Sequence, residues 1–112
     1  MMDETNKRSH FRLEFPPTER PRLVSGKFEL IVLEVSEGGC SVEVLESASA
    51  AFAVAGVPVK GFMIFADGDR HDVEGKVIRV AGRNRVSIQF TQGVSFAKMM
   101  AEHRRILTRY QS

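Results

Sequence analysis

Two arginines stand four residues apart near the start of the chain, in the run Arg8-Ser9-His10-Phe11-Arg12. A guanidinium group is a planar fork of N–H donors that matches a phosphate or the Hoogsteen edge of guanine, and it also stacks on bases. Lys7 precedes the pair and adds a further cation for phosphate. Two such arginines on one arm are suited to clamp a small ligand that carries phosphate groups or guanine bases.

A second motif follows where an apolar run meets a pair of glycines, in the stretch Glu34-Val35-Ser36-Glu37-Gly38-Gly39. The Ser36 hydroxyl is a hydrogen-bond donor and acceptor, and Gly39 allows a ligand or a neighbouring backbone to approach closely. Gly39 is also expected to be needed for the turn itself, whether or not a ligand binds there.

The two motifs, in this order and at this separation, resemble the signature of the PilZ family. That signature is RxxxR in an N-terminal arm, followed about twenty-odd residues later by (D/N)xSxxG. Arg8 and Arg12 match the first part, and Ser36 and Gly39 match the second. Glu34 departs from the pattern, because the family has Asp or Asn at that position. The resemblance covers nearly the whole chain and implies a small β-barrel that binds the bacterial second messenger cyclic di-GMP.

The resemblance also implies a role for each motif residue. The arginines of the arm clamp cyclic di-GMP, and the second motif forms the floor of the site on the barrel. The extra methylene of Glu34 displaces its carboxylate, and sites that depend on buried hydrogen bonds tolerate misplacement poorly. A second interpretation therefore stays open, a degenerate PilZ adaptor that acts by protein–protein contact without nucleotide. The expected ligand-binding residues are Lys7, Arg8, Arg12, Glu34, Ser36 and Gly39.

Hydrophobic alternation predicts the elements that must position these residues. A period-two pattern from Leu23 to Val35 predicts a strand with apolar residues on both faces. Gly-containing turns separate the strands that follow, which is typical of an antiparallel barrel or sandwich. The resemblance implies a mainly β fold, a small antiparallel six-stranded PilZ-type β-barrel with a C-terminal α-helix. The later strands are expected over residues 40–44, 59–65, 73–78 and 86–90.

The two ends of the chain differ from this middle. Residues 1–22 are expected to form a flexible N-terminal arm, in which Pro16-Pro17 excludes a helix. Residues 23–112 are expected to form the barrel and its helix as a single domain. Apolar residues recur at helical spacing near the C-terminus, with charged residues mostly on the opposite side. The apolar set is Phe96, Met99, Met100, His103, Ile106, Leu107 and Tyr110, and the charged set is Lys98, Glu102, Arg104, Arg105 and Arg109.

Composition narrows the classes of function. The 112 residues leave room for one domain, and the net charge of +2 is too small for a protein that coats nucleic acid. Basic residues concentrate at the two ends, where they would form a patch for a small anion if the ends met. A barrel for single-stranded nucleic acid is a further alternative, but the middle of the chain is acidic and most aromatics have core-like spacing.

Several properties are expected to be absent. No apolar run approaches the roughly 20 residues that span a bilayer, and no signal peptide is evident, so the cytoplasm is the expected compartment. Cys40 is the only cysteine and is expected in the core. No catalytic constellation, cofactor motif or metal-ligand spacing appears. Together with these absences, the PilZ resemblance implies a non-enzymatic receptor that orders its arm on binding cyclic di-GMP and thereby regulates an effector protein.

Overall fold

The computed structural model describes residues 12–44, 51–52, 54–82 and 84–111. The predicted site residues Lys7 and Arg8 lie outside the described residues. The elements are β1 (Arg12–Glu14), the 3-10 helix η1 (Pro17–Glu19), β2 (Arg22–Ser25), β3 (Phe28–Ser36), β4 (Gly39–Glu43), β5 (Pro58–Ile64), β6 (Arg70–Ala81), β7 (Arg85–Gln92) and α2 (Phe96–Gln111).

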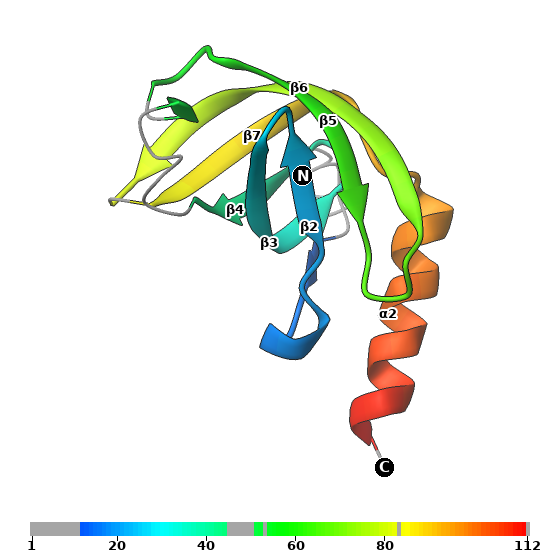
Figure 1. Ribbon diagram of the computed structural model, residues 1–112. Helices are drawn as coiled ribbons and strands as arrows, with labels where there is room; N and C mark the ends of the chain where they lie inside the picture. Colours follow the sequence, from blue (N-terminus) through cyan, green and yellow to red (C-terminus); the bar gives the residue numbers. More distant parts are fainter. Residues whose placement is uncertain (1–11, 45–50, 53, 83, 112) are drawn as a thin grey trace, which may run out of the picture.

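Six strands close into an antiparallel barrel in the order β3-β2-β5-β6-β7-β4, with β4 pairing back onto β3 (Figure 1). Strand β1 is added to β3 beyond the end of β2, through the pairs Arg12–Ser36, Leu13–Val35 and Glu14–Glu34. The prediction of a mainly β, six-stranded barrel with a C-terminal helix is confirmed. Alternate residues along the strands point inward and fill the core, among them Leu23, Leu30, Val32, Val42, Val59, Met63, Val73, Val77, Val86 and Ile88.

The single strand predicted from Leu23 to Val35 is wrong, because the chain reverses within it. Gly26 adopts a positive φ of 62° in the turn that separates β2 from β3. Glycine adopts this conformation without the steric cost that a Cβ atom brings. The turn creates a hairpin, and β2 then pairs with β3 on one side and β5 on the other.

A β-bulge in β3 explains why this strand carries apolar residues on both faces. The register of the β3–β4 pairing shifts between Val32 and Glu34. In a regular strand, side chains alternate between the two faces, so Val32 and Val35 would lie on opposite faces. Both are nevertheless buried. The extra residue changes the phase of the strand, so that Glu34 and Ser36 alternate with inward Val35 and face outward. The bulge therefore turns the second motif to the outer face of the barrel.

The exclusion of a helix at Pro16-Pro17 is also wrong. Pro16 has extended backbone angles, φ −60° and ψ 153°, and the 3-10 helix η1 begins at the next residue, Pro17. Proline is favoured in the first turn of a helix because the N–H group it lacks would have no helical partner there. The helix η1 places Glu19, which is 2% exposed, in the interior of the molecule.

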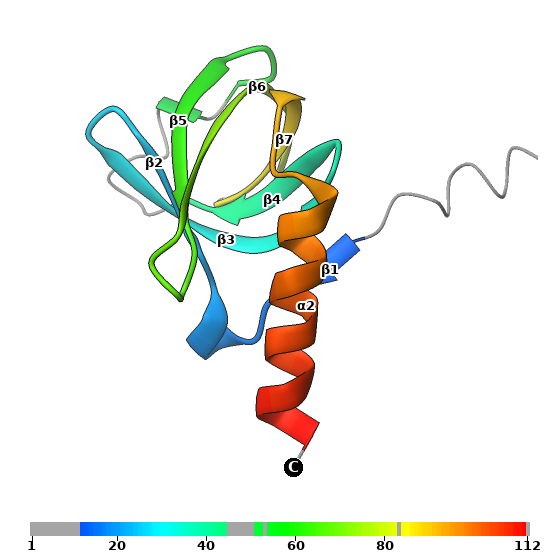
Figure 2. The ribbon, with the colours of Figure 1, turned by 90° about the vertical axis from the view of Figure 1, so that its right-hand side faces the viewer.

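Helix α2 starts near the rim of the barrel and runs past β1 and η1 (Figure 2). Met99 and Ile106 are buried as predicted. Glu102, predicted on the polar side, is only 1% exposed, whereas Phe96 and Leu107, predicted on the apolar side, are 47% and 40% exposed. Among the described residues, no helix has the length and hydropathy needed to cross a membrane.

Ion pairs join the N-terminal segment to α2. Arg105 contacts Glu19 through Nη1 at 2.5 Å and Glu102 through Nη2 at 2.6 Å. Arg109 Nε lies 3.1 Å from the other carboxylate oxygen of Glu19. Hydrogen bonds to Glu102 and Glu19 raise the pKa of Arg105. Helix α2 thus meets the segment that holds η1, and at this contact Arg105 and Arg109 are paired with Glu19. The basic patch expected from the sequence also includes Lys7 and Arg8, which lie outside the described residues.

Lys98 extends the same network to the turn between β5 and β6. Its Nζ lies 3.1 Å from Asp67, 2.9 Å from Asp69 and 3.2 Å from Glu102. It also stands 4.8 Å from the centroid of the Phe65 ring, as in a cation–π contact. Burial alone lowers the pKa of Lys98, but hydrogen bonds to the three carboxylates outweigh burial and raise it. The network therefore fixes α2 to a barrel turn as well as to η1.

Candidate functional site

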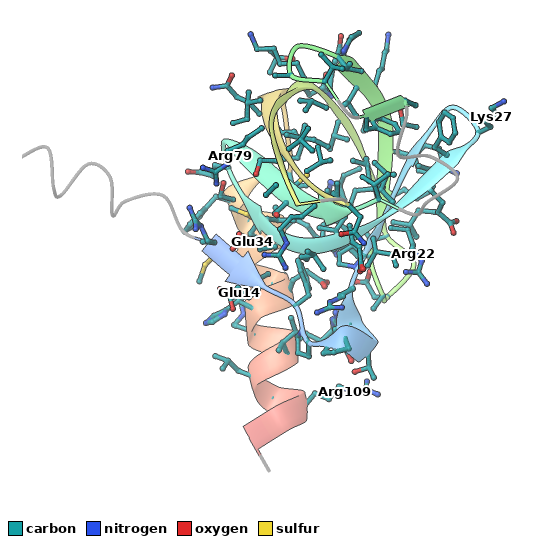
Figure 3. The ribbon with its side chains drawn as sticks, turned by 90° about the vertical axis from the view of Figure 1, so that its left-hand side faces the viewer. Glu14, Arg22, Lys27, Glu34, Arg79 and Arg109 are labelled. Atoms are coloured by element: carbon teal, nitrogen blue, oxygen red, sulfur yellow. The ribbon has the colours of Figure 1, made fainter. Side chains whose placement is uncertain are left out.

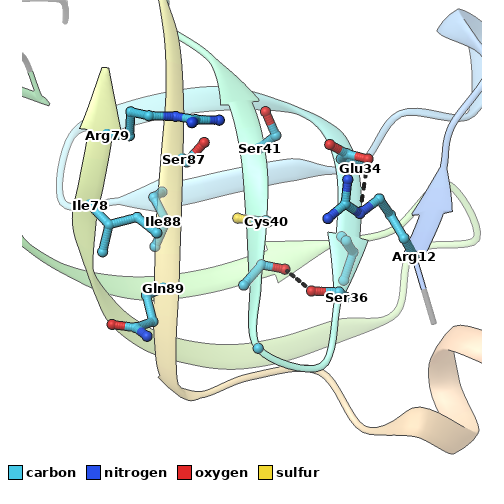
Figure 4. Close-up of a pocket in the computed structure, with 13 residues that line it drawn as sticks. Arg12, Glu34, Ser36, Cys40, Ser41, Ile78, Arg79, Ser87, Ile88 and Gln89 are labelled. Atoms are coloured by element: carbon cyan, nitrogen blue, oxygen red, sulfur yellow. Dashed lines mark hydrogen bonds and ion pairs between the residues drawn. The ribbon is translucent and has the colours of Figure 1, made fainter. Parts of the chain in front are cut away.

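A cavity of about 310 Å³ lies on the outer face of the barrel, beside β1 (Figure 4). Strand pairing explains its construction, because the outward residues of neighbouring strands lie in two rows. One row runs Arg12–Ser36–Gly39–Gln89, and the other runs Glu34–Ser41–Ser87–Arg79. The wall consists of Arg12, Glu34, Val35, Ser36, Gly38, Gly39, Cys40, Ser41, Ile78, Arg79, Ser87, Ile88 and Gln89.

The structure brings four of the predicted site residues together around this cavity: Arg12, Glu34, Ser36 and Gly39. Arg12 comes from β1, and the others come from the end of β3 and the start of β4. They meet because β1 pairs with the end of β3, which continues through a tight turn into β4. Their role in binding a ligand stays a prediction.

Arg12 and Glu34 form an ion pair across the β1–β3 ladder, with Nε and Oε1 3.7 Å apart. Arg12 lies opposite Ser36, so Glu34 is its diagonal neighbour, within reach of a long side chain. The Arg12 side chain is 68% exposed, whereas that of Glu34 is 28% exposed. An exposed pair of this kind is weak and releases the guanidinium readily to a stronger anionic partner.

Ser36 and Gly39 hold the turn between β3 and β4. The Ser36 Oγ donates a hydrogen bond to the carbonyl oxygen of Gly39 at 3.4 Å. A Cβ atom added to Gly39 would overlap the carbonyl oxygen of Ile88 on β7. Gly39 is therefore required for the close approach of β4 and β7, in agreement with the structural need expected from the sequence.

Cys40 is a core residue, as the sequence predicted. Its side chain is 7% exposed, and burial raises the pKa of its thiol to about 12. The thiol is therefore protonated at neutral pH and is a poor nucleophile. Cys40 supports the floor of the cavity by packing from below.

The opposite wall comes from strands that the motifs do not touch. Ser87 and Gln89 of β7 alternate with buried Val86 and Ile88 and face outward. Nothing local indicated that this face lies beside β1. Ser87, Gln89 and the β6 residues Ile78 and Arg79 were not predicted as part of the site. Figure 3 shows Arg79, Glu34 and Glu14 along one side of the molecule, with Arg22 and Lys27 on the other side.

Comparisons with known proteins agree with the fold. The model of the PilZ domain matches residues 6–111. The solved PilZ domain with c-di-GMP of YcgR from Escherichia coli aligns with a TM-score of 0.69 and 15% identity, over 92% of this chain and 96% of that chain. YcgR in complex with c-di-GMP, also from Escherichia coli, aligns with a TM-score of 0.54 and 16% identity, over 91% of this chain and 45% of that chain. No curated protein matches the sequence.

Proposed function

The chain belongs to the PilZ domain family, and on that premise we propose that it is a receptor for cyclic di-GMP. The observation that carries the proposal is the cavity in which Arg12, Ser36 and Gly39, three residues of the family signature, lie together. Both YcgR structures that share the fold are complexes with c-di-GMP. The proposed activity is binding alone, and a second messenger of this kind places the protein in the bacterial cytoplasm.

The chemistry of the cavity fits the ligand. Arg12 offers its fork of donors to a guanine Hoogsteen edge or to a phosphate, and Arg8 and Lys7 precede it on the same arm. Ser36 offers a hydroxyl, and Gly39 keeps β4 close to β7 where the two strands form part of the cavity wall. The Glu34 carboxylate accepts N–H groups of guanine once Arg12 has turned from it to the ligand.

A calorimetric titration with cyclic di-GMP tests the proposal. We expect the wild type to bind and Arg12→Ala to lose about 1–3 kcal/mol of binding free energy, as for one bidentate guanine contact. Arg22→Ala is the matched control, because Arg22 is an exposed arginine on β2 that lines none of the cavity. A wild type that gives neither heat nor a thermal shift at high ligand concentration rules the receptor out.

One observation favours a second candidate function, an adaptor that binds protein without nucleotide. Glu34 stands where the family has Asp or Asn, and its carboxylate occupies Arg12 at 3.7 Å. If this ion pair does not open, Arg12 stays bound to Glu34 and is not available to a nucleotide. The titration separates the two candidates, because only the receptor gives heat with cyclic di-GMP.

We further propose that the ligand fixes the N-terminal arm on the barrel and that a partner protein binds the surface formed by the closed arm. Arg12 belongs to β1, and the rest of the proposed floor belongs to β3 and β4. A ligand held between them stabilises the short β1–β3 pairing, which continues at Phe15 N–H to Leu33 C=O, 3.0 Å apart. Such a change from a loosely held to a fixed segment is a common switch.

Hydrogen exchange tests this coupling. With saturating cyclic di-GMP, we expect the amides of β1 and of Phe15 to exchange at least about ten-fold more slowly, because ligand binding adds to the cost of opening. Peptides from β5 serve as the internal control, since β5 contributes no residue to the cavity. Calorimetric binding without slower exchange in β1 contradicts arm closure and leaves the receptor proposal intact.

A further inference from the structure

A second β-bulge lies in the cavity wall formed by β6. The β6–β7 register shifts between Val77, which pairs with Ile88, and Arg79, which pairs with Ser87. Ile78 is the extra residue. Val77 is fully buried, whereas Ile78 is 48% exposed and Arg79 is exposed as well. Bulges re-aim side chains and are over-represented next to functional sites.

The bulge places the Arg79 side chain in the cavity. Figure 4 shows it extended from β6 across Ser87 toward Ser41 and Glu34. Arg12 reaches the same cavity from β1, on the other wall. The two arginines therefore face the space from opposite walls, although they come from distant parts of the sequence.

Charge pairing distinguishes the two arginines. The charged side chains that line the cavity are Arg12, Glu34 and Arg79, since the Cys40 thiol is protonated. Arg12 and Glu34 neutralise each other as an ion pair. Arg79 has no carboxylate within 4.0 Å among the described residues. Among the described residues that line the cavity, the unpaired positive charge is thus that of Arg79.

We infer that Arg79 binds a phosphate of the ligand, an inference that rests on the proposed function. A cyclic dinucleotide carries two phosphates on opposite sides of its ring. The arm takes one of them from the β1 side, and Arg79 takes the other from the β6 side. Arg79 belongs to neither motif of the family signature, so it is an additional affinity-determining residue of this chain.

Titration of point variants with cyclic di-GMP tests this role. We expect Arg79→Ala to bind about ten-fold more weakly, equivalent to about 1.4 kcal/mol at 25 °C. Arg79→Lys keeps the charge and is expected to stay within about three-fold of the wild type, because phosphate accepts a lysine as a point charge. Lys60→Ala is the control. It removes the same charge from β5, outside the cavity, and should leave affinity unchanged.

Each result has one meaning. Equal affinities of Arg79→Ala and Lys60→Ala overturn the inference while the receptor proposal stands. A loss in Arg79→Lys as large as in Arg79→Ala overturns the assignment of Arg79 as a charge contact to phosphate. No binding by the wild type overturns the proposed function itself. Thermal unfolding of each variant confirms that these exposed positions do not disturb the fold.

Discussion

Gly39→Ala is expected to lower the free energy of unfolding by about 2–3 kcal/mol and to weaken cyclic di-GMP binding at least about ten-fold. The new Cβ would overlap the carbonyl oxygen of Ile88 and lie 3.2 Å from its carbonyl carbon. Both atoms belong to a paired backbone, so β4 and β7 must separate to make room. Urea unfolding measures the loss of stability, and calorimetry measures the loss of affinity.

The neighbouring glycine provides the matched control. A Cβ atom on Gly38 would have no heavy atom within 4 Å, and Gly38 does not need a positive φ. Gly38→Ala should therefore change the free energy of unfolding by no more than about 0.5 kcal/mol. If both variants unfold at the same urea concentration, the close approach at Gly39 does not limit stability.

The second large effect is expected at Glu102. Glu102→Ala removes the carboxylate that accepts from Arg105 at 2.6 Å and from Lys98 at 3.2 Å, at a position only 1% exposed. Breaking a buried pair by removing one partner leaves the other charge poorly compensated and costs about 3–5 kcal/mol. The expected loss is about 3 kcal/mol, because Arg105 keeps Glu19 and Lys98 keeps Asp67 and Asp69. Urea unfolding followed by circular dichroism measures it.

Two further variants identify the cause of that loss. Arg104→Ala truncates an exposed residue of the same helix and should cost no more than about 0.5 kcal/mol. Glu102→Gln keeps the shape and the acceptor oxygen, and should fall between Arg104→Ala and Glu102→Ala. A cost for Glu102→Ala as small as for Arg104→Ala would mean that the network does not stabilise the fold.

Most of the barrel could be predicted from hydrophobic alternation. Strands with one face in the core show period two directly, which located β4, β5 and β7 within a few residues. The method failed between Leu23 and Ser36. There a glycine turn and a bulge both lie inside a continuous apolar run, and the bulge reverses which residues face inward. Alternation carries no separate signal for either feature.

The site residues that belong to local motifs could be predicted from the sequence. Those that reach the cavity only through the pairing of distant strands could not. Arg12, Ser36 and Gly39 belong to two short motifs that can be read along the chain. Arg79 reaches the same cavity only through the β6–β7 register and an unpaired Ile78. Glu102 was misplaced for a related reason: helical periodicity ranks side chains by polarity, whereas here two cations make burial of a carboxylate favourable.

The contact between Glu19 and Arg105 has a consequence for the order in which the molecule assembles. These residues stand 86 positions apart, so their ion pair forms only after α2 has been synthesised. Closing a long loop lowers the entropy of the chain before the contact can stabilise it, and this slows folding. On the ribosome, η1 emerges before α2 and gains its anchor only when α2 follows. The segment that we propose to close over the ligand is therefore also the segment whose attachment completes the fold.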